Sequence, residues 1–301
     1  MPVSRHGRYF LVPSEGREIH GLEVEEVVLD LQTSYQNLVI ARTSGFGHAL
    51  YLDGDFMSCE GDEHLYHEAL VLPALLAQPA PRRALVLGGG EGATARELLR
   101  DPGLESVRMV ELDREVIEAC KKHLPSMSAG AFEDPRLEVC VQDALEVVRD
   151  ERNADLIVHD LTDPLEGGPS CPLFTEEFFQ DCRRAMSPRG VLVVQVGAMK
   201  LWREQTQLDA LDAMRAVFPW VFPYAVGVPS FGCDWVLTMA SMHEPAFPRE
   251  PRAVDAMIEQ RGIRGLRTYD GLTHTGLMHP PGHLRWLLAT PQERTKEATA
   301  R

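Results

Sequence analysis

From Ala84 onward, apolar strand segments alternate with helical segments, and this alternation limits the chain to one broad architecture. ALVLG (84–88) precedes the helical segment 93–100, and the same order repeats over 106–124, 137–150, 154–186 and 191–218. Such repeats build a mainly parallel sheet covered by helices on both faces. Two consecutive late strands, 220–228 and 234–241, predict an antiparallel edge. We expect an α/β fold with a methyltransferase-type, Rossmann-like doubly wound sheet.

The first eighty residues carry a different pattern. Residues 22–58 contain alternating or apolar segments rich in β-branched residues, and TSGFG (43–47) predicts a hairpin turn between two strands. A helical segment, 62–78, ends before Pro79 and Pro81. We expect residues 1–80 to form a small N-terminal β domain with a linking helix, and residues 81–301 to form the Rossmann-like catalytic domain.

Composition narrows the class of protein. Of the 301 residues, 44% are hydrophobic, yet no apolar run is long enough to cross a bilayer. The net charge of −15 makes nucleic acid and anionic membranes poor partners. Six scattered cysteines without CxxC spacing favour reduced thiols, and the N-terminal residues lack an apolar signal core. We therefore expect a cytoplasmic protein.

A glycine-rich turn follows the first strand of the larger domain. Gly88, Gly90 and Gly92 have G-x-G-x-G spacing. Glycines here let the backbone approach a ligand and let the next helix pack on the sheet, as in nucleoside-type cofactor sites. A tight strand-to-helix turn without a ligand would use the same residues. Because Glu91 lies inside the turn, the site would repel phosphate and favour a cationic ligand.

Acidic residues follow the next strands. Glu111 is placed to accept from ribose hydroxyls, whereas Asp113 is the better candidate for a helix N-cap. Asp143 can cap the next helix and also accept from an exocyclic amino group such as adenine N6. Asp160 and Asp163 are either turn formers or acids that hold and deprotonate an ammonium group.

In combination, these motifs resemble the polyamine aminopropyltransferases, the spermidine and spermine synthase family. The resemblance covers about residues 25–242, on GGGEGATARE (88–97), VELD (110–113), QDA (142–144), DLTDPLEGGP (160–169), SYQ (34–36) and DEHLYHE (62–68). GEGATARE, YHE (66–68) and VPSFGCDW (228–235) are similar to the thermospermine synthase and prokaryotic triamine branch.

The resemblance implies that the aminopropyl group of decarboxylated S-adenosylmethionine moves to a polyamine, with release of methylthioadenosine. The donor is a co-substrate, no cofactor is bound permanently, and no metal is needed. Asp160 takes the general-base position, Glu91 holds the amino end of the aminopropyl group, and the acceptor lies along Tyr66, His67 and Asp163. The residues implied for the thioadenosine are Gln36, Gly88, Gly90, Gly92, Glu111, Asp143, Ala144 and Pro169.

Glu91 gives the donor preference a physical reason. Ordinary S-adenosylmethionine carries a carboxylate near the glycine turn, which Glu91 would repel, whereas the decarboxylated donor has only an ammonium there. A neutral His67 could accept from the acceptor amine, and a protonated one would repel it. The edges of the N-terminal sheet favour a homodimer or homotetramer.

The resemblance of YHE and VPSFGCDW to the triamine branch implies spermidine as the acceptor. Phe231 offers no hydroxyl to hold the distal ammonium of a short diamine, whereas a longer cation can reach acids farther along the tunnel. Putrescine, agmatine and norspermidine stay open as alternatives, as does the end of spermidine that is extended. A spermidine synthase using putrescine is the first rival. An S-adenosylmethionine-dependent methyltransferase and a non-catalytic polyamine-binding module are rivals of other classes, against which the set of acids argues.

Overall fold

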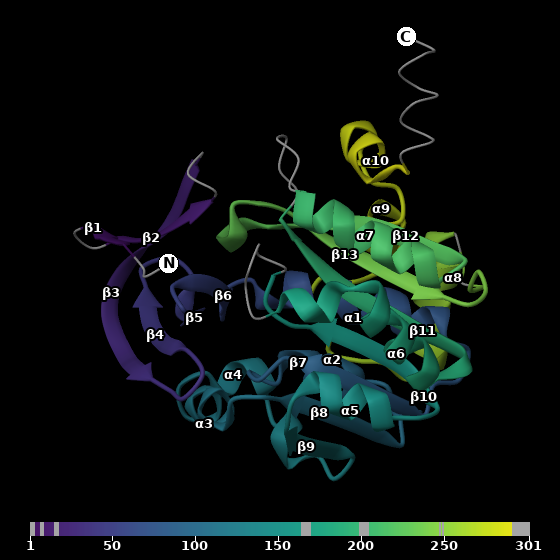
Figure 1. Cartoon of the computed structure of the whole chain (residues 1–301), viewed down its shortest axis with the longest axis horizontal. Helices are drawn as coiled ribbons and strands as arrows, with labels where there is room; N and C mark the ends of the chain where they lie inside the picture. The colour runs from purple at the N-terminus through teal and green to yellow at the C-terminus, as the bar shows by residue number, and fades with distance from the viewer. Residues whose placement is uncertain are drawn as a thin grey trace.

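Two sheets organise the chain (Figure 1). The computed structural model describes residues 4–6, 9–14, 18–163, 170–198, 205–246, 248 and 250–290. The smaller sheet is antiparallel, with its strands in chain order: β1 (Ser4–His6), β2 (Tyr9–Ser14), β3 (Glu18–Gln32), β4 (Asn37–Thr43), β5 (Gly47–Leu52) and β6 (Asp55–Cys59). The predicted hairpin turn joins β4 to β5, and its Gly47 has a left-handed φ of 72°. β1 and β2 precede the first predicted strand.

The larger sheet has the order β12-β13-β11-β10-β7-β8-β9. Five strands run parallel: β7 (Arg83–Gly88), β8 (Ser106–Glu111), β9 (Leu137–Val141), β10 (Ala154–Asp160) and β11 (Met186–Ala198). β13 (Cys233–Ser241) pairs antiparallel with β11, and β12 (Trp220–Val228) pairs antiparallel with β13. The predicted doubly wound sheet with an antiparallel edge is confirmed. Its strand order reverses between β7 and β10, where such sheets bind ligands.

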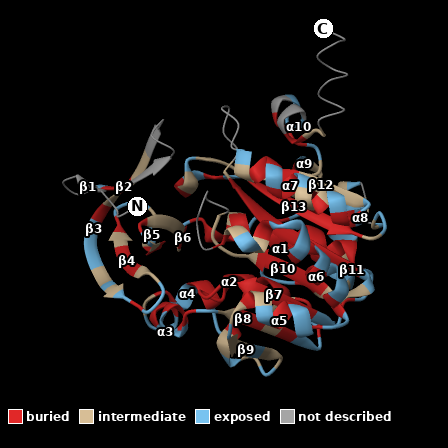
Figure 2. Ribbon diagram, in the orientation of Figure 1, coloured by how far each residue is buried: buried red, intermediate tan, exposed pale blue. Residues whose placement is uncertain are grey.

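Helices cover both faces of the larger sheet, and alternate residues of β7 explain the two layers. Val86 packs in a cluster with α1 and α2, whereas Leu85 and Leu87 pack in a cluster with α5, α6 and α7. These helices are α1 (Glu63–Ala77), α2 (Ala93–Leu99), α5 (Ala144–Asp150), α6 (Glu176–Ala185) and α7 (Gln205–Val217). Figure 2 shows the strands between the two layers mostly buried.

Two short helices join the sheets. α3 (Arg114–His123) and α4 (Pro125–Ser128) bury Val116 and Met127 against Leu38 and Ile40 of β4. Helix α1 packs on the larger sheet, although it lies within residues 1–80. The division at residue 80 stays a prediction.

Three further helices follow the last strand, outside the predicted alternation: α8 (Pro251–Gln260), α9 (Gly271–Leu277) and α10 (Gly282–Leu288). Single-turn 3-10 helices are η1 (Ala131–Glu133), η2 (Cys171–Phe174) and η3 (Pro229–Phe231). Within the described ranges, none of the helices has the length and apolar character needed to span a membrane.

Candidate active site

The glycine turn packs directly against the end of β10. Gly88 and Gly92 both have φ of 84°, a backbone conformation that favours glycine. A Cβ at Gly88 would lie 2.1 Å from the carbonyl oxygen of Asp160, and one at Gly90 would lie 2.8 Å from Oε2 of Glu111. Glycine is therefore required where the turn approaches two of the acids that end neighbouring strands.

The Asp160 carboxylate is held from two helices. The Tyr66 hydroxyl on α1 donates to Oδ1 at 2.7 Å, and the Thr94 hydroxyl on α2 donates to Oδ2 at 2.6 Å. Burial raises the pKa of Asp160, and the nearby Glu91 carboxylate raises it further, while His67, Thr94 and Tyr66 act in the opposite direction. The site thus holds an acid of increased basicity in a fixed orientation, as proton transfer requires.

His67 lies between two carboxylates. Its Nε2 faces Oε1 of Glu91 at 3.0 Å, and its Nδ1 faces Oε2 of Glu63 at 2.9 Å and the carbonyl oxygen of Glu63 at 2.7 Å. Burial alone would lower the pKa of His67, but the hydrogen bonds and charges of Glu63 and Glu91 raise it to about 10. At neutral pH His67 is therefore a cation, which differs from the neutral acceptor of an amine proton considered above.

Glu91, His67 and Asp160 converge in one place, since one ligand atom from each lies within 4.8 Å of the others. A metal ion needs a neutral histidine with a free ring nitrogen. Both ring nitrogens of His67 already face a carboxylate, so neither is free for a metal ion in this arrangement. Two carboxylates at this spacing instead suit an organic cation.

The expected ribose acid, Glu111, lies beside the glycine turn and accepts from the Asp113 backbone N–H at 3.0 Å. Burial raises the pKa of Glu111 to about 7, with a further contribution from Glu91. Asp113 caps α3 by accepting from Glu115 N at 3.0 Å, so the N-cap interpretation is confirmed. The Gln36 amide donates to the same carboxylate at 3.2 Å, which places Gln36 at this end of the sheet.

The structure describes two of the three residues expected near the adenine. Asp143 caps α5 by accepting from Leu145 N at 2.8 Å, which confirms its N-cap interpretation, and Ala144 is the first residue of that helix. Pro169 lies outside the described residues. Asp163 is half-buried, and a Cβ at Gly197 would lie 3.3 Å from its Oδ2.

An aromatic cluster adjoins Asp160 through Tyr66. The Phe231 ring lies 5.8 Å from the Tyr66 ring, 4.6 Å from the Trp235 ring and 5.7 Å from the Phe56 ring, between centroids. Such rings contact both methylenes and cations favourably. The cluster could line the path of a chain that carries ammonium groups.

The loop that carries Phe231 is anchored at Ser230. The backbone N–H and the hydroxyl of Ser230 both donate to the Asp62 carboxylate at 2.8 Å, and its carbonyl oxygen lies 2.7 Å from Nε2 of His20. These contacts tie the loop to the start of α1 and to β3 of the small sheet.

Glu63, Thr94 and Arg96 lie within the motifs given above, but no role was predicted for them from the sequence. A signal existed for one of them, because Glu63 and His67 are spaced i, i+4 and so share a face of any helix. Glu63 contacts Arg96 on α2, and His67 contacts Glu91 in the glycine turn. Thr94 on α2 contacts Asp160. These partners come from distant positions in the chain, which only the fold brings together.

Residues 63–250 match the model of the spermine/spermidine synthase domain, and residues 14–60 match that of the spermidine synthase tetramerisation domain. The chain is 42% identical over 275 residues to a polyamine aminopropyltransferase of Synechococcus sp. (strain JA-2-3B'a(2-13)), covering 88% of each chain. It is 38% identical over 232 residues to thermospermine synthase ACAULIS5 of Arabidopsis thaliana, covering 76% of this chain and 68% of that protein.

A crystal structure of spermidine synthase in complex with the transition state analogue AdoDATO matches with a TM-score of 0.86. That match has 28% identity and covers 96% of this chain and 97% of the other. The family uses decarboxylated S-adenosylmethionine as co-substrate, and residues 14–60 form an oligomerisation domain. The chain therefore belongs to the spermine/spermidine synthase family and is an aminopropyltransferase of polyamine synthesis.

Proposed function

We propose that the acceptor of this aminopropyltransferase is spermidine, bound along Tyr66, Asp163 and Phe231. The observation that carries the proposal is the continuity from Asp160 through its hydrogen bond with Tyr66 to the ring contact between Tyr66 and Phe231. A polyamine along this path has its reacting amine at the carboxylate and its methylenes on aromatic rings. Phe231 supplies no hydroxyl for the distal ammonium of a short diamine.

Asp160 acts as the general base in this proposal. Free alkylamines are almost wholly protonated near neutral pH, so the attacking nitrogen must first lose a proton. The sulfonium already makes the aminopropyl carbon electrophilic, so the protein aligns the amine and accepts its proton. The new N–C bond forms as the C–S bond breaks, the proton passes to Asp160, and methylthioadenosine leaves.

The donor lies on the other side of the Glu91 and Asp160 carboxylates. Glu91 binds the ammonium of the aminopropyl group, and Glu111 accepts from the ribose hydroxyls. Gly88, Gly90 and Gly92 let the backbone approach the nucleoside, with Gln36 at the same end of the sheet. Asp143, Ala144 and Pro169 are assigned to the adenine. No permanently bound cofactor or metal takes part in this assignment.

We also propose a homotetramer or homodimer built through the N-terminal sheet, which the match over residues 14–60 supports. A cytoplasmic location is proposed because all six cysteines are free thiols. Nucleic acid and membranes are not expected as partners, since the net charge of −15 opposes both.

The test measures kcat/KM of the purified protein with the decarboxylated donor and, in separate assays, putrescine, agmatine, norspermidine or spermidine. We expect the highest kcat/KM for spermidine and a tetraamine product, whose fragmentation in mass spectrometry shows which end was extended. A clear preference for putrescine would favour the rival spermidine synthase assignment. Transfer of a methyl group from ordinary S-adenosylmethionine would favour the methyltransferase alternative.

Phe231→Tyr is the matched variant for the acceptor assignment. The added hydroxyl should raise the relative kcat/KM for putrescine while the aromatic contact with Tyr66 is kept. Unchanged ratios among the acceptors would remove Phe231 from the specificity argument.

A further inference from the structure

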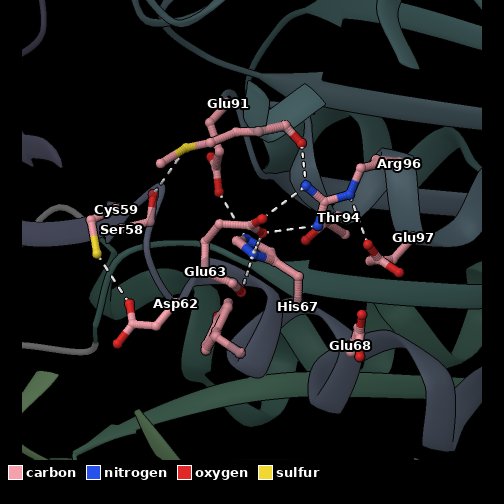
Figure 3. A network of polar contacts seen from close by, with 12 residues as sticks. Ser58, Cys59, Asp62, Glu63, His67, Glu68, Glu91, Thr94, Arg96 and Glu97 are labelled. Carbon is pink, nitrogen blue, oxygen red and sulfur yellow. Dashed lines mark hydrogen bonds and ion pairs between the residues drawn. The ribbon is translucent and has the colours of Figure 1, made fainter. Parts of the chain in front are cut away.

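A row of charges of alternating sign, buried except for the half-buried Arg100, runs from α2 to the glycine turn. Figure 3 shows the row from Glu97 to Glu91. Each member contacts the next through a hydrogen bond or ion pair, with separations between 2.7 and 3.0 Å. The members, in order, are Arg100, Glu97, Arg96, Glu63, His67 and Glu91. The row ends at the carboxylate that we assign to the donor ammonium.

Glu63 is the central member, and both of its oxygens are engaged. Arg96 donates Nη1–H to Oε1 at 3.0 Å and Nη2–H to Oε2 at 2.9 Å, a fork geometry that fixes the plane of a carboxylate. Oε2 also faces His67 Nδ1. Burial would raise the pKa of Glu63, but His67 and Arg96 lower it to about 2, so the carboxylate stays charged.

The His67 ring is fixed by this arrangement. Ionised carboxylates only accept hydrogen bonds, so two ring nitrogens that each face a carboxylate both donate. A ring flip would break both contacts, and the side chain is only 1% exposed. The Nε2–H of His67 therefore engages Glu91 Oε1 and leaves Oε2 for the ammonium of the donor.

We propose that Glu63 and Arg96 are positioning residues, which act through His67 to hold the Glu91 carboxylate in the orientation that receives the donor. The inference rests on the proposed donor role of Glu91. Stability alone gives little reason for such a row, because apolar side chains of similar volume commonly replace buried ion pairs without loss.

The positioning role predicts a specific pH effect. Among the described residues, the groups that act on His67 are Glu63 and Tyr66 on its own helix, Glu91 in the glycine turn, Asp160 at the end of β10, and Arg96 on α2 through Glu63. The Glu63 and Glu91 carboxylates together oppose the effect of burial on His67, so without the Glu63 charge the pKa of His67 would fall. Above the lowered pKa, a bare Nε2 would repel Glu91, so donor binding would weaken as pH rises.

The experiment measures the dissociation constant of the decarboxylated donor against pH for the full-length protein and for Glu63→Gln. We expect an alkaline decline in Glu63→Gln that starts at lower pH than in the wild type and reaches about tenfold or more, the usual effect of losing one charge-assisted contact. The kcat measured at saturating donor should change much less than the KM for the donor. Adding His67→Gln, which cannot titrate, should abolish the decline.

Glu68→Gln is the matched control. Glu68 is a buried carboxylate on the same helix. It accepts hydrogen bonds from the backbone N–H groups of residues 267–269 and not from His67. This variant should lose thermal stability and keep the wild-type pH profile. A decline shared with Glu68→Gln, or one that persists after His67→Gln is added, would overturn the inference.

Two further results separate the claims. If Glu63→Gln does not fold, the wild type and His67→Gln are compared, and the wild-type alkaline decline must be absent from His67→Gln. Unchanged donor affinity in Glu91→Gln would overturn the donor role of Glu91 and this inference with it. A normal effect of Glu91→Gln together with no shift in Glu63→Gln would overturn the inference alone.

Discussion

Tyr66 donates its hydroxyl to Oδ1 of Asp160 at 2.7 Å, and so joins the aromatic cluster to the carboxylate at the end of β10. Burial, and next the charge of Asp160, raise the pKa of Tyr66 well above its usual value, so the hydroxyl stays a donor. The bond in turn lowers the pKa of Asp160 and partly offsets the effect of burial. The basicity of Asp160 therefore depends on Tyr66, a member of the aromatic cluster that we propose lines the acceptor path.

Tyr66→Phe should move the acidic limb of kcat/KM to higher pH. Losing the hydroxyl removes a contribution that lowers the pKa of Asp160, so the carboxylate is protonated over a wider range and cannot accept a proton there. At mildly acidic pH we expect a loss of about tenfold, equivalent to one hydrogen bond to a charged group. Thr94→Val removes the bond to Oδ2 and should shift the limb in the same direction. An unchanged limb in both variants would contradict this account of Asp160.

Glu91→Gln should weaken the decarboxylated donor and reduce discrimination against S-adenosylmethionine. The lost charge-assisted contact is worth about 1.5–3 kcal/mol, or roughly tenfold to a hundredfold in affinity. Calorimetric titration with both donors measures the ratio directly. Equal selectivity in variant and wild type would remove Glu91 from donor recognition.

His159 should make the fold sensitive to acid. Its ring is fully buried, lies against Phe174 and Phe178, and has Nε2 3.1 Å from the Leu173 carbonyl oxygen. Burial lowers its pKa to about 4. Because the unfolded chain binds this proton near its ordinary pKa, stability is full above that pKa and is lost as pH falls toward the folded value, by about 3 kcal/mol.

Urea unfolding of the wild type and His159→Leu, at fixed protein concentration, checks this effect. The free energy of unfolding should fall less steeply in the variant between neutral and mildly acidic pH. Parallel slopes in the two proteins would show that His159 does not contribute. His67 acts in the opposite sense, since a raised pKa gives stability at low pH that is lost as pH rises through about 10.

The larger sheet was predictable because its buried strands are continuous apolar runs and its helices follow them at regular spacing. The helix caps at Asp113 and Asp143 were predictable for a local reason, since a cap bonds a backbone N–H two residues away. The sequence of α8 also indicates a helix, with Pro251 at its first position and Val254, Met257 and Ile258 on one face. It was not predicted, because it follows the last strand of the strand–helix alternation.

The charge state of His67 was not predictable in the same way. Glu63 is its neighbour on the helix, but Glu91 reaches it from 24 residues away, and the pKa depends on burial that the sequence does not give. The Phe231 contacts likewise join β6, α1 and β13. Sequence motifs thus supplied the candidate residues, and the fold determined which of them interact.

Asp160→Asn, with donor affinity and single-turnover rate measured on the same preparation, tests the central claim most directly. Asparagine keeps the size of the side chain and removes its basicity, so the donor should bind nearly as in the wild type. The single-turnover rate with spermidine should fall by about a hundredfold to ten-thousandfold, the usual effect of removing a general base. A near wild-type rate at neutral pH, or a loss confined to donor affinity, would contradict the assignment of Asp160 as the base.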